Sequence, residues 1–422
     1  MVRSFTASTT LLFIVLSTSC ADDWPQWRGI HRDGRSAETN VDLDFRDGEP
    51  KLLWRTEGVG KGYASLAIVD GVIYTTGNLP SGQAVIARKA SDGSEIWATS
   101  ITSQAPEHGY PGARCTPSVT SDHVYAVTSD GQIVCLTRAD GKLVWSRSFT
   151  SDWNGEMMSK WGFSESPLID GDRVICTPGG SNALIVALNR MTGEQIWASK
   201  AFESDHGKDG AGYSSVVISM ACGVKQYVTL AGRGVVSVDA ETGQTLWTYA
   251  PVANKTANIP TPIPFDDYVF CSSGYGTGSA LLHIVREGDK LTANEEYFLQ
   301  AGTLQNHHGG MIRVGDFLYC GHGHNEGFPT CLKISTGDVV WGGKLRGVGK
   351  GSAAVTMVGD NLLFRYQSGH IASVKATPDS YQLMGSFMPE YQEGNSWSHP
   401  VVVNGRLYLR EQNVLMCYDV SE

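Results

Sequence analysis

Ala90-Ser-Asp-Gly-Ser-Glu-Ile-Trp97 contains the pattern that decides the fold of this chain. A small or polar residue leads into a tight turn with glycine, and the short strand that follows ends in tryptophan. The phrase returns as Ala139-Asp-Gly-Lys-Leu-Val-Trp145, Met191-Thr-Gly-Glu-Gln-Ile-Trp197, Glu241-Thr-Gly-Gln-Thr-Leu-Trp247 and Ser335-Thr-Gly-Asp-Val-Val-Trp341. Asp-Gly or Thr-Gly between alternating apolar runs is typical of a β-hairpin. The first four tryptophans are 48, 52 and 50 residues apart, which indicates an internal structural repeat.

Further predicted strands precede each phrase. In the second repeat they begin with Ser118-Val-Thr120, and together with the strand of the phrase they make four in one repeat. In the second repeat, Val124-Tyr-Ala-Val-Thr128 and Ile133-Val-Cys-Leu136 flank the turn at Asp130-Gly131. Four antiparallel strands in about 45 residues are typical of one blade of a β-propeller. The blade cores are predicted at 63–97, 114–145, 164–197, 212–247, 260–298, 307–341, 351–387 and 397–420. The fifth and seventh repeats lack the tryptophan, and Phe298 and Phe387 stand near its place.

The eighth repeat has only three strands and ends at Leu415-Met-Cys-Tyr-Asp419. A lone strand with a tryptophan, Lys51-Leu-Leu-Trp54-Arg55, precedes the first repeat and is predicted to span about 51–57. Pairing the two ends of the chain in one blade would close the ring and remove exposed sheet edges. We therefore predict an all-β fold, an eight-bladed propeller of four-stranded antiparallel blades at 51–422, after an extended segment at 22–50.

The first 21 residues are predicted to be a signal peptide. Arg3 supplies a positive charge, the apolar run 11–16 follows, and Ser19 and Ala21 fit a cleavage site. The run is too short for a transmembrane helix, which needs about 20 apolar residues. Cys20 leaves a lipid anchor open as the alternative to a soluble secreted form. Either way, we expect a periplasmic or secreted protein.

The charge composition of the chain argues against two classes of partner, nucleic acids and anionic membranes. Charged residues make up 18% of the chain, the formal net charge is −10, and there is no basic run. Nucleic acid and anionic membranes attract basic patches, so neither is an expected partner. Eight cysteines remain after Cys20 and lie mostly in apolar strands, where a thiol packs as a small hydrophobe. If a disulfide forms, Cys320 and Cys331 are the predicted pair. We expect a monomer.

The repeated phrase resembles that of the PQQ-like propellers, named after the pyrrolo-quinoline quinone (PQQ) repeat. These include quinoprotein alcohol dehydrogenases and a propeller lipoprotein of outer-membrane β-barrel assembly. The opening Asp23-Trp24-Pro-Gln-Trp27-Arg-Gly29 resembles the start of many exported bacterial members. For the dehydrogenases, the resemblance implies PQQ held between a tryptophan and a disulfide of adjacent cysteines, with Ca²⁺ held by Glu and Asn beside an Asp base. No Cys-Cys pair occurs in this chain. The residues that remain for such a site are Trp153, Trp161, Trp397, Glu165, Asn154 and Asn395.

The predicted functional face is one rim of the ring. Turns within the outer and inner hairpins are short, whereas the blade-to-blade links and the turns between the second and third strands are long. Polar and aromatic groups around a channel mouth form the usual propeller site. The predicted ligand-binding residues are His108, Arg114, Trp161, Glu165, His206, His307, His308 and His399. A metal is a further hypothesis for the histidines of the sixth blade: His307, His308, His322 and His324.

The leading functional hypothesis is a binding or scaffold protein for a periplasmic protein, a peptide or a carbohydrate. The alternatives are a quinoprotein-type oxidoreductase with PQQ and calcium, and a lyase or hydrolase that uses histidine as acid or base. The chain has no G-x-S-x-G and no H-E-x-x-H motif, so sequence motifs do not select a reaction. Whether the protein is an enzyme stays open at this point.

Overall fold

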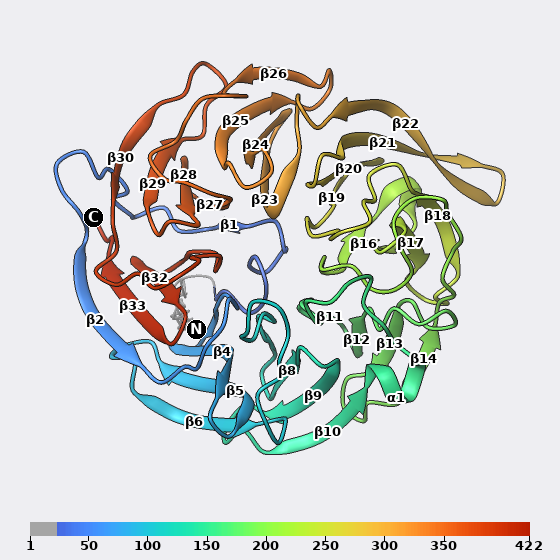
Figure 1. Cartoon of the computed structure of the whole chain (residues 1–422), viewed down its shortest axis with the longest axis horizontal. Coiled ribbons are helices and arrows are strands. Elements are labelled where there is room, and N and C mark those ends of the chain that lie inside the picture. The colour runs from blue at the N-terminus through green and yellow to red at the C-terminus, as the bar shows by residue number, and fades with distance from the viewer. Residues whose placement is uncertain (1–22) are drawn as a thin grey trace, which may run out of the picture.

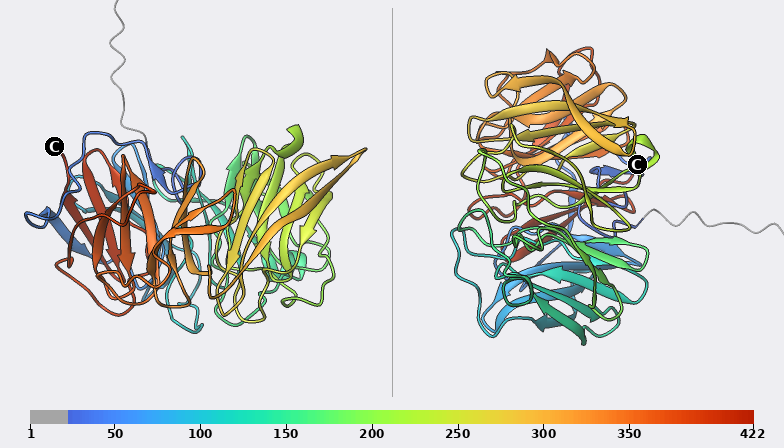
Figure 2. Two further views of the ribbon diagram at one scale, coloured as in Figure 1. Left: turned by 90° about the horizontal axis from the view of Figure 1, so that it is seen from above. Right: turned by 90° about the vertical axis from the view of Figure 1, so that its right-hand side faces the viewer.

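A computed structural model describes residues 23–422 of the chain. Eight sheets follow one another around a central axis in the order of the sequence (Figure 1). Seen from the side, they form a flattened ring in which the strands run between two rims (Figure 2). The predicted eight-bladed, nearly all-β propeller is therefore confirmed, and each predicted blade core coincides with one sheet.

The first four blades have the following strands and helices. Blade 1 contains β3 (Ala67–Val69), β4 (Val72–Leu79), β5 (Gly82–Lys89) and β6 (Glu95–Ser100). Blade 2 contains β7 (Ser118–Val119), β8 (His123–Val127), β9 (Gln132–Thr137) and β10 (Leu143–Ser148), followed by α1 (Phe149–Trp153). Blade 3 contains β11 (Leu168–Asp170), β12 (Arg173–Cys176), β13 (Val186–Asn189) and β14 (Gln195–Ala198). Blade 4 contains β15 (Val217–Ser219), the 3-10 helix η1 (Ala221–Gly223), β16 (Gln226–Ala231), β17 (Gly234–Asp239) and β18 (Thr245–Tyr249).

The last four blades complete the ring. Blade 5 contains β19 (Ile263–Phe265), β20 (Tyr268–Ser273), β21 (Gly278–Glu287) and β22 (Lys290–Gln300). Blade 6 contains β23 (Asn306–Val314), β24 (Phe317–His322), β25 (Phe328–Lys333) and β26 (Asp338–Trp341). Blade 7 contains β27 (Ala353–Val358), β28 (Asn361–Tyr366), β29 (Ile371–Lys375) and β30 (Leu383–Phe387), with β1 (Arg35–Ser36) added beside β27. Blade 8 contains β31 (Val401–Val403), β32 (Arg406–Glu411), β33 (Val414–Asp419) and β2 (Lys51–Glu57).

The ring closes through the two ends of the chain, as predicted. Strand β2 pairs antiparallel with β33 from Lys51 opposite Asp419 to Glu57 opposite Val414. The indole of Trp54 then reaches into blade 1, where its Nε1 donates to the carbonyl of Ala90 at 3.2 Å. The N-terminal strand thus supplies both the missing outer strand and the missing tryptophan.

The repeated tryptophan joins each blade to the next. Trp97 of blade 1 donates from Nε1 to the carbonyl of Arg138 at 3.1 Å, and its ring lies against Gly141 of blade 2. The glycine has φ of 69°, which favours residues without a side chain, and a Cβ there would lie 2.5 Å from the indole. Trp145 contacts Arg190 and Gly193 in the same way. The glycine and the tryptophan of the phrase therefore both take part in contacts between blades.

In blade 5 the residue at the tryptophan position is Tyr297, next to the Phe298 that was predicted to lie near it. A bulge pairs Leu281 with Tyr297, the register that Ala87 and Trp97 have in blade 1. The Tyr297 hydroxyl donates to the carbonyl of Ile334 in blade 6 at 2.6 Å. Tyrosine thus takes the role of tryptophan here.

Blade 7 fills the corresponding space from elsewhere in the chain. Phe45 of the N-terminal segment pairs with Gly385 beside β30. Its ring centroid lies 5.1 Å from that of Phe387, in a cluster that contains residues of blades 7 and 8. Phe387 therefore packs between blades 7 and 8, and Phe45 packs there beside it.

The eight cysteines at 115, 135, 176, 222, 271, 320, 331 and 417 are free thiols. The predicted pair fails because of strand register: Cys320 faces Thr330, and Cys331 faces Tyr319. Neighbours offset by one position on paired strands point to opposite faces of a sheet. Cys331 accordingly packs in one core cluster and Cys320 in another.

The segment that precedes the propeller crosses its central channel. Trp24 pairs with Ile68 of blade 1, and Arg35 pairs with Met357 of blade 7, two blades away around the ring (Figure 1). Between them, Arg32 donates to the carbonyls of Val216 at 3.0 Å and Ser166 at 2.6 Å. Residues 24–36, called the plug below, thereby fill the channel from the rim opposite the long loops.

Hydroxyl groups connect the inner strands of successive blades at the other end of the channel. The amide of Ser65 donates to Thr116 Oγ1 at 3.1 Å, and the amide of Thr116 donates to Ser166 Oγ at 3.0 Å. The amide of Ser166 donates to Ser215 Oγ at 3.0 Å. The polar residues before several inner strands are thus structural links between blades.

The predicted signal peptide and Cys20 lie outside the described residues. Among the helices in 23–422, none has the length and apolar character needed to cross a membrane.

Candidate functional site

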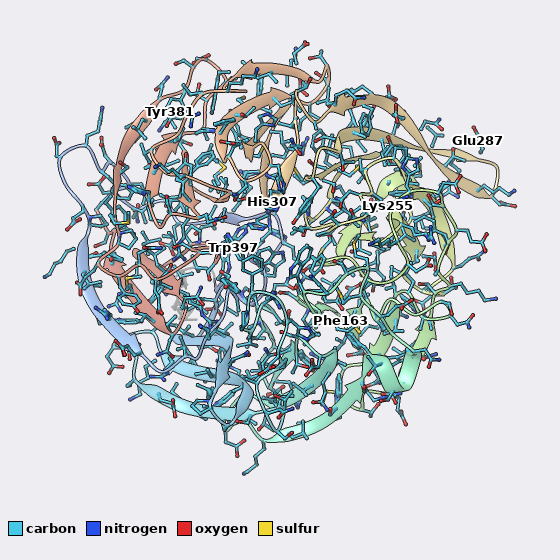
Figure 3. The ribbon with its side chains drawn as sticks, viewed as in Figure 1. Phe163, Lys255, Glu287, His307, Tyr381 and Trp397 are labelled. Carbon is cyan, nitrogen blue, oxygen red and sulfur yellow. The ribbon has the colours of Figure 1, made fainter. Side chains whose placement is uncertain are left out.

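A cavity of about 490 Å³ opens on the predicted functional rim, above the plug. Its walls come from the blade-to-blade links and from the turns between second and third strands. Figure 3 shows His307 and Trp397 close to the axis, whereas Tyr381 and Glu287 lie at the outer edge of the ring. The site is therefore shared by several blades.

Blade 6 contributes two adjacent histidines that both line the cavity, His307 and His308. In a regular strand their side chains would point to opposite faces. Here the register between β23 and β24 is interrupted between Asn306 and Met311, and Gly309 and Gly310 have φ of 78° and 90°. This bulge turns the two imidazoles to the same side, where their ring centroids lie 3.9 Å apart.

These imidazoles are held neutral. Burial, with a smaller contribution from neighbouring imidazoles, lowers the pKa of His307 to about 2 and that of His308 to about 3. His307 Nδ1 lies 2.7 Å from Ser352 Oγ, and Nε2 lies 3.2 Å from the hydroxyl of Tyr275. Burial also lowers the pKa of His324, which lies against His307, and of His399. The histidines therefore add polarity to the cavity but no charge near neutral pH.

Two arginines give the cavity its charge. Arg28 of the plug donates to the carbonyls of Met311 at 2.6 Å and Asp33 at 2.8 Å. Arg114 donates from Nη2 to the carbonyls of Gly109 and Tyr110, at 2.7 Å each. Burial lowers the pKa of both guanidinium groups, that of Arg28 to about 10, so both stay protonated at neutral pH. No Asp or Glu of the described residues lines the cavity.

Aromatic side chains form much of the remaining wall. Trp397 has Tyr63, Tyr110 and His308 around it, with ring centroids 4.8, 5.0 and 4.6 Å away. Its Nε1 donates to Gln367 Oε1 at 2.9 Å, which fixes the indole. The aromatic residues that line the cavity are Trp27, Tyr63, Tyr110, Trp161, Tyr213, Tyr275 and Trp397. This composition, apolar with a few placed polar groups, is typical of small-molecule sites.

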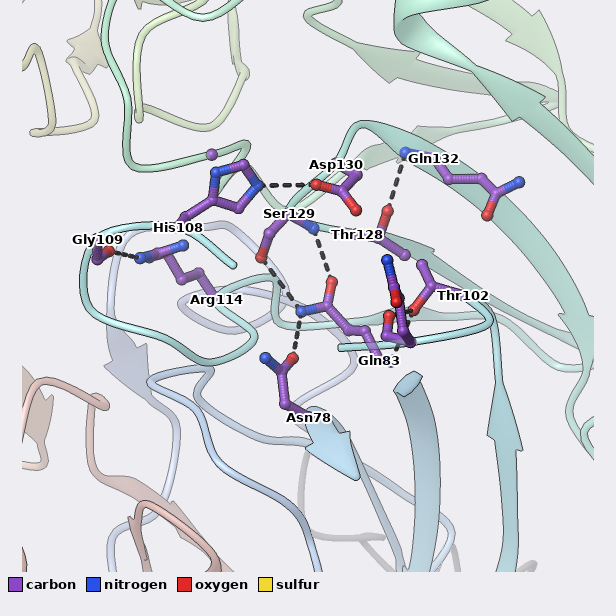
Figure 4. Close-up of polar contacts among 12 residues, drawn as sticks. Asn78, Gln83, Thr102, His108, Gly109, Arg114, Thr128, Ser129, Asp130 and Gln132 are labelled. Carbon is purple, nitrogen blue, oxygen red and sulfur yellow. Dashed lines mark hydrogen bonds and ion pairs between the residues drawn. The ribbon is translucent and has the colours of Figure 1, made fainter. Parts of the chain in front are cut away.

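Of the predicted ligand-binding residues, five line this cavity: Arg114, Trp161, His307, His308 and His399. His108 instead bonds Asp130 at 2.8 Å (Figure 4), and His206 is exposed away from the cavity. Glu165 is buried beside the cavity and accepts a hydrogen bond from the amide of Thr177 at 2.6 Å. Burial raises the pKa of Glu165 to about 7, against the opposing effect of that bond and of Arg32.

The four histidines proposed for a metal do not all meet. His307, His308 and His324 lie together, but His322 turns away and accepts a hydrogen bond from the amide of Gln305 at 3.1 Å. Among residues 23–422, no group of three or more His, Cys, Asp and Glu side chains is arranged to hold a metal ion. Of the four predicted metal ligands, only His307, His308 and His324 lie next to one another.

The residues present do not fit PQQ with calcium. Calcium prefers several oxygen ligands, with carboxylates among them, and no carboxylate in the described part of the chain lines the cavity. The buried carboxylate of Glu165 accepts a hydrogen bond from the amide of Thr177. Trp153 donates from Nε1 to Gln195 Oε1, at the outer side of blade 3. Of the candidates named from sequence, only Trp161, Trp397 and Asn395 line the cavity.

Sequence reasoning missed the contribution of the plug and of the tyrosines. Trp27 and Arg28 form the floor of the cavity, and the Trp27 ring lies 4.5 Å from that of His399. The signal available was an aromatic and basic segment, Trp24-Pro-Gln-Trp27-Arg28, placed before the first strand of the fold. Tyr63, Tyr213 and Tyr275 had no distinguishing pattern.

The family model described as "Outer membrane protein assembly factor BamB" matches residues 38–148 and 83–343, which together exceed half of the chain. The chain belongs to the PQQ-like β-propeller family. Curated relatives of this propeller include BamB of Shewanella oneidensis, 21% identical over 228 residues, which are 54% of this chain and 52% of the relative. A quinoprotein ethanol dehydrogenase of Pseudomonas putida is 26% identical over 162 residues, 35% of this chain and 24% of the relative.

Solved structures show the same fold. BamB from Moraxella catarrhalis superposes with a TM-score of 0.61 at 15% identity, covering 88% of this chain and 98% of that one. The quinohemoprotein alcohol dehydrogenase from Comamonas testosteroni gives 0.66 at 13% identity, covering 94% and 80%. At such identities the likeness shows the propeller fold alone, and the matched regions of the curated relatives span about half of one and a quarter of the other. The shared fold therefore does not define the function of this chain, and the cavity is the feature that bears on it.

Proposed function

We propose that this PQQ-like propeller is an exported binding protein whose rim cavity holds a small ligand without transforming it. The observation that carries the proposal is the composition of the cavity wall: seven aromatic residues, neutral imidazoles and two guanidinium groups, with no carboxylate among the described residues. Such a wall supplies contact area and directed hydrogen bonds, which binding requires.

The same wall is poorly suited to acid–base chemistry. Efficient general acids and bases have pKa values near the working pH, and those of His307 and His308 are lowered to about 2 and 3. The Ser352 hydroxyl lies 2.7 Å from His307, but Ser352 is buried and does not line the cavity. The contact satisfies a ring nitrogen and does not present a nucleophile. These features favour binding over the lyase or hydrolase hypothesis.

The similarity to known proteins is compatible with a binding function but does not by itself select binding over catalysis. The matching family model is described as an outer membrane protein assembly factor, while one curated relative is a dehydrogenase. The dehydrogenase alternative requires a site for PQQ and calcium, which the cavity residues do not provide. A peptide or a protein segment inserted into the cavity is the second kind of occupant to test.

The proposal is tested by blocking the cavity. Thr256 is exposed at the cavity wall, and only its backbone takes part in hydrogen bonds, so Thr256→Trp is expected to fill the mouth without unfolding the blade. Lys255→Trp is the matched control, because Lys255 is exposed beside it but does not line the cavity. Sugars, organic acids, aromatic compounds, peptides and PQQ with Ca²⁺ are screened by thermal denaturation.

We expect ligands that raise the melting temperature of the wild type and of Lys255→Trp but not of Thr256→Trp. A ligand at 100 times its Kd stabilises the folded state by about 2.7 kcal/mol, which such a screen detects. The ligand should be recovered chemically unchanged after incubation. Stabilisation by PQQ with Ca²⁺, followed by alcohol oxidation, would refute the binding role and establish the dehydrogenase.

Export is proposed from residues 1–21, and lipidation of Cys20 is its open variant. Expression of the full chain with radiolabelled palmitate separates the two forms. A label that Cys20→Ala abolishes would identify a lipoprotein, and an unlabelled protein starting at residue 22 would identify the soluble form.

A further inference from the structure

Arg114 has unused bonding capacity in the cavity wall. Its Nη2 makes two hydrogen bonds to carbonyls, but its Nη1 is buried without a partner among the described residues. Nearly all buried polar groups in proteins have a partner, and leaving a charged donor unpaired is especially costly. Because Arg114 lines the cavity, a shift of its guanidinium that brings Nη1 to a ligand acceptor would remove that cost.

The fold neutralises another buried arginine internally. Arg365 Nη2 lies 2.7 Å from Glu411 Oε2, and both side chains are 1% exposed. For Arg114 no carboxylate contributes to its electrostatic surroundings, and the neighbouring groups that do are the hydroxyls of Tyr213 and Tyr63. The positive charge of Arg114 is therefore left for an external partner.

A second unpaired donor lies in the floor. Trp27 Nε1 is buried without a partner in the described part of the chain, and Trp27 lines the cavity. Guanidinium and indole nitrogens only donate hydrogen bonds, so both groups require acceptor atoms. A carboxylate has two acceptor oxygens and the charge that matches Arg114.

The aromatic walls indicate what carries the carboxylate. Seven aromatic residues surround a cavity of about 490 Å³, and Trp397 is held by its bond to Gln367. Aromatic side chains provide large contact areas for rings at a low entropic cost. A ring that fits between them would lie within reach of the arginine.

Positive charge continues outside the cavity. A groove of about 540 Å³ adjoins it and shares Asn325, Gln367 and Asn395 with it. Arg346 and Lys350 line this groove, with Glu326 as the only carboxylate of the described lining residues. The approach to the cavity is thus basic in a chain whose net charge is −10, and such local fields attract anions.

We infer that the ligand of the cavity is a small carboxylic acid built on a ring, with its carboxylate at Arg114 and its ring between the aromatic side chains. The inference rests on the binding function proposed above and specifies its ligand class. Sugar acids and aromatic acids share this chemistry.

Four probes in matched pairs test the inference: D-galacturonate with D-galactose, and benzoate with benzamide. Binding is followed by tryptophan fluorescence, since Trp27, Trp161 and Trp397 line the cavity, and by calorimetry. The variants are Arg114→Gln, which removes the charge, and Arg114→Lys, which keeps it. Lys89→Gln, an exposed charge on the first blade, is the control.

We expect one acid to bind about ten- to a hundredfold more tightly than its neutral analogue, the range of a hydrogen bond to a charged group. The preference should vanish in Arg114→Gln, persist in part in Arg114→Lys and be unchanged in Lys89→Gln. The preferred pair tells a sugar acid from an aromatic acid. Equal or tighter binding of the neutral analogues would overturn the inference but leave the binding function intact. Failure of all four probes with folded protein would also overturn the inference, whereas the binding function is overturned only if no compound of the broader screen stabilises the wild type.

Discussion

Trp97 of blade 1 and Gly141 of blade 2 are in contact across the boundary between their blades, and this contact accounts for the residue type at both positions. The indole of Trp97 covers Gly141 so closely that a Cβ on the glycine would lie 2.5 Å from it, and Trp97 Nε1 is fixed by the carbonyl of Arg138. The tryptophan that ends one repeat therefore requires the glycine that begins the same phrase in the next. The repeated phrase therefore reflects contacts between neighbouring blades as well as the strands within one blade.

Gly141→Ala is expected to destabilise the propeller by more than its backbone conformation alone explains. Gly171→Ala is the matched control, because Gly171 has φ of 58° but a Cβ there would have no atom within 4 Å. A non-glycine residue in this region costs about 1–2 kcal/mol. Chemical denaturation should give that loss for Gly171→Ala and a clearly larger one for Gly141→Ala. Equal losses would show that the Trp97 contact is not tight.

Arg32→Gln is expected to loosen the plug. The change removes charged hydrogen bonds to the carbonyls of Ser166 and Val216, each of which contributes about 1.5–3 kcal/mol. Hydrogen exchange of residues 24–36 should accelerate, while the outer strands of the blades stay protected. Arg35→Gln, an exposed position in the same segment, should change little. Unchanged exchange in Arg32→Gln would mean that the plug is held by other contacts.

Glu165→Gln is expected to change how stability depends on pH. The pKa of Glu165 is raised to about 7 in the folded state, above its value of about 4.3 in an unfolded chain. The protonated carboxyl therefore stabilises the fold fully below about pH 4, and this contribution of roughly 4 kcal/mol is lost as the pH rises to about 7. The variant should lack this decline between about pH 4 and 7 in urea denaturation. Glu156→Gln, at an exposed site, should retain it; parallel curves for both variants would contradict the assignment.

His308→Asn is expected to make the protein less sensitive to acid. The folded-state pKa of His308, about 3, lies below the unfolded value of about 6.5. The neutral imidazole thus contributes fully above pH 6.5, and the contribution falls by about 1.4 kcal/mol per pH unit as the pH drops towards 3. Denaturation at pH 7, 6 and 5 measures the slope. His206→Asn, on the same rim but outside the cavity, serves as control. A wild-type slope in His308→Asn would show that this histidine is not held neutral.

The blades were predictable because their signal is local. Each turn and its tryptophan lie within eight residues of the sequence. The eighth repeat lacked a fourth strand, and the strand at 51–57 was the unassigned strand that could complete it. The tyrosine at 297 was missed because blade 5 has no tryptophan at the end of its outer strand to mark the position, and Tyr297 and Phe298 are adjacent aromatic residues.

The site was only partly predictable because it is assembled across the ring. The rim followed from strand order, and Arg114, Trp161, His307, His308 and His399 do line the cavity. Which loop residues converge depends on ring closure and on side-chain direction. The floor depends on the plug, whose path through the channel is set by contacts with distant blades, such as the bond between Arg28 and the carbonyl of Met311, 283 residues away.

The most direct test of the account is hydrogen exchange across the whole chain, with and without saturating D-galacturonate or the better-binding probe acid. Binding in the cavity predicts slower exchange in the rim segments 107–114, 305–310 and 394–399 and in the plug at 24–28. Protection confined to the opposite rim, at 170–173 or 358–361, would contradict the claim that this cavity is the binding site.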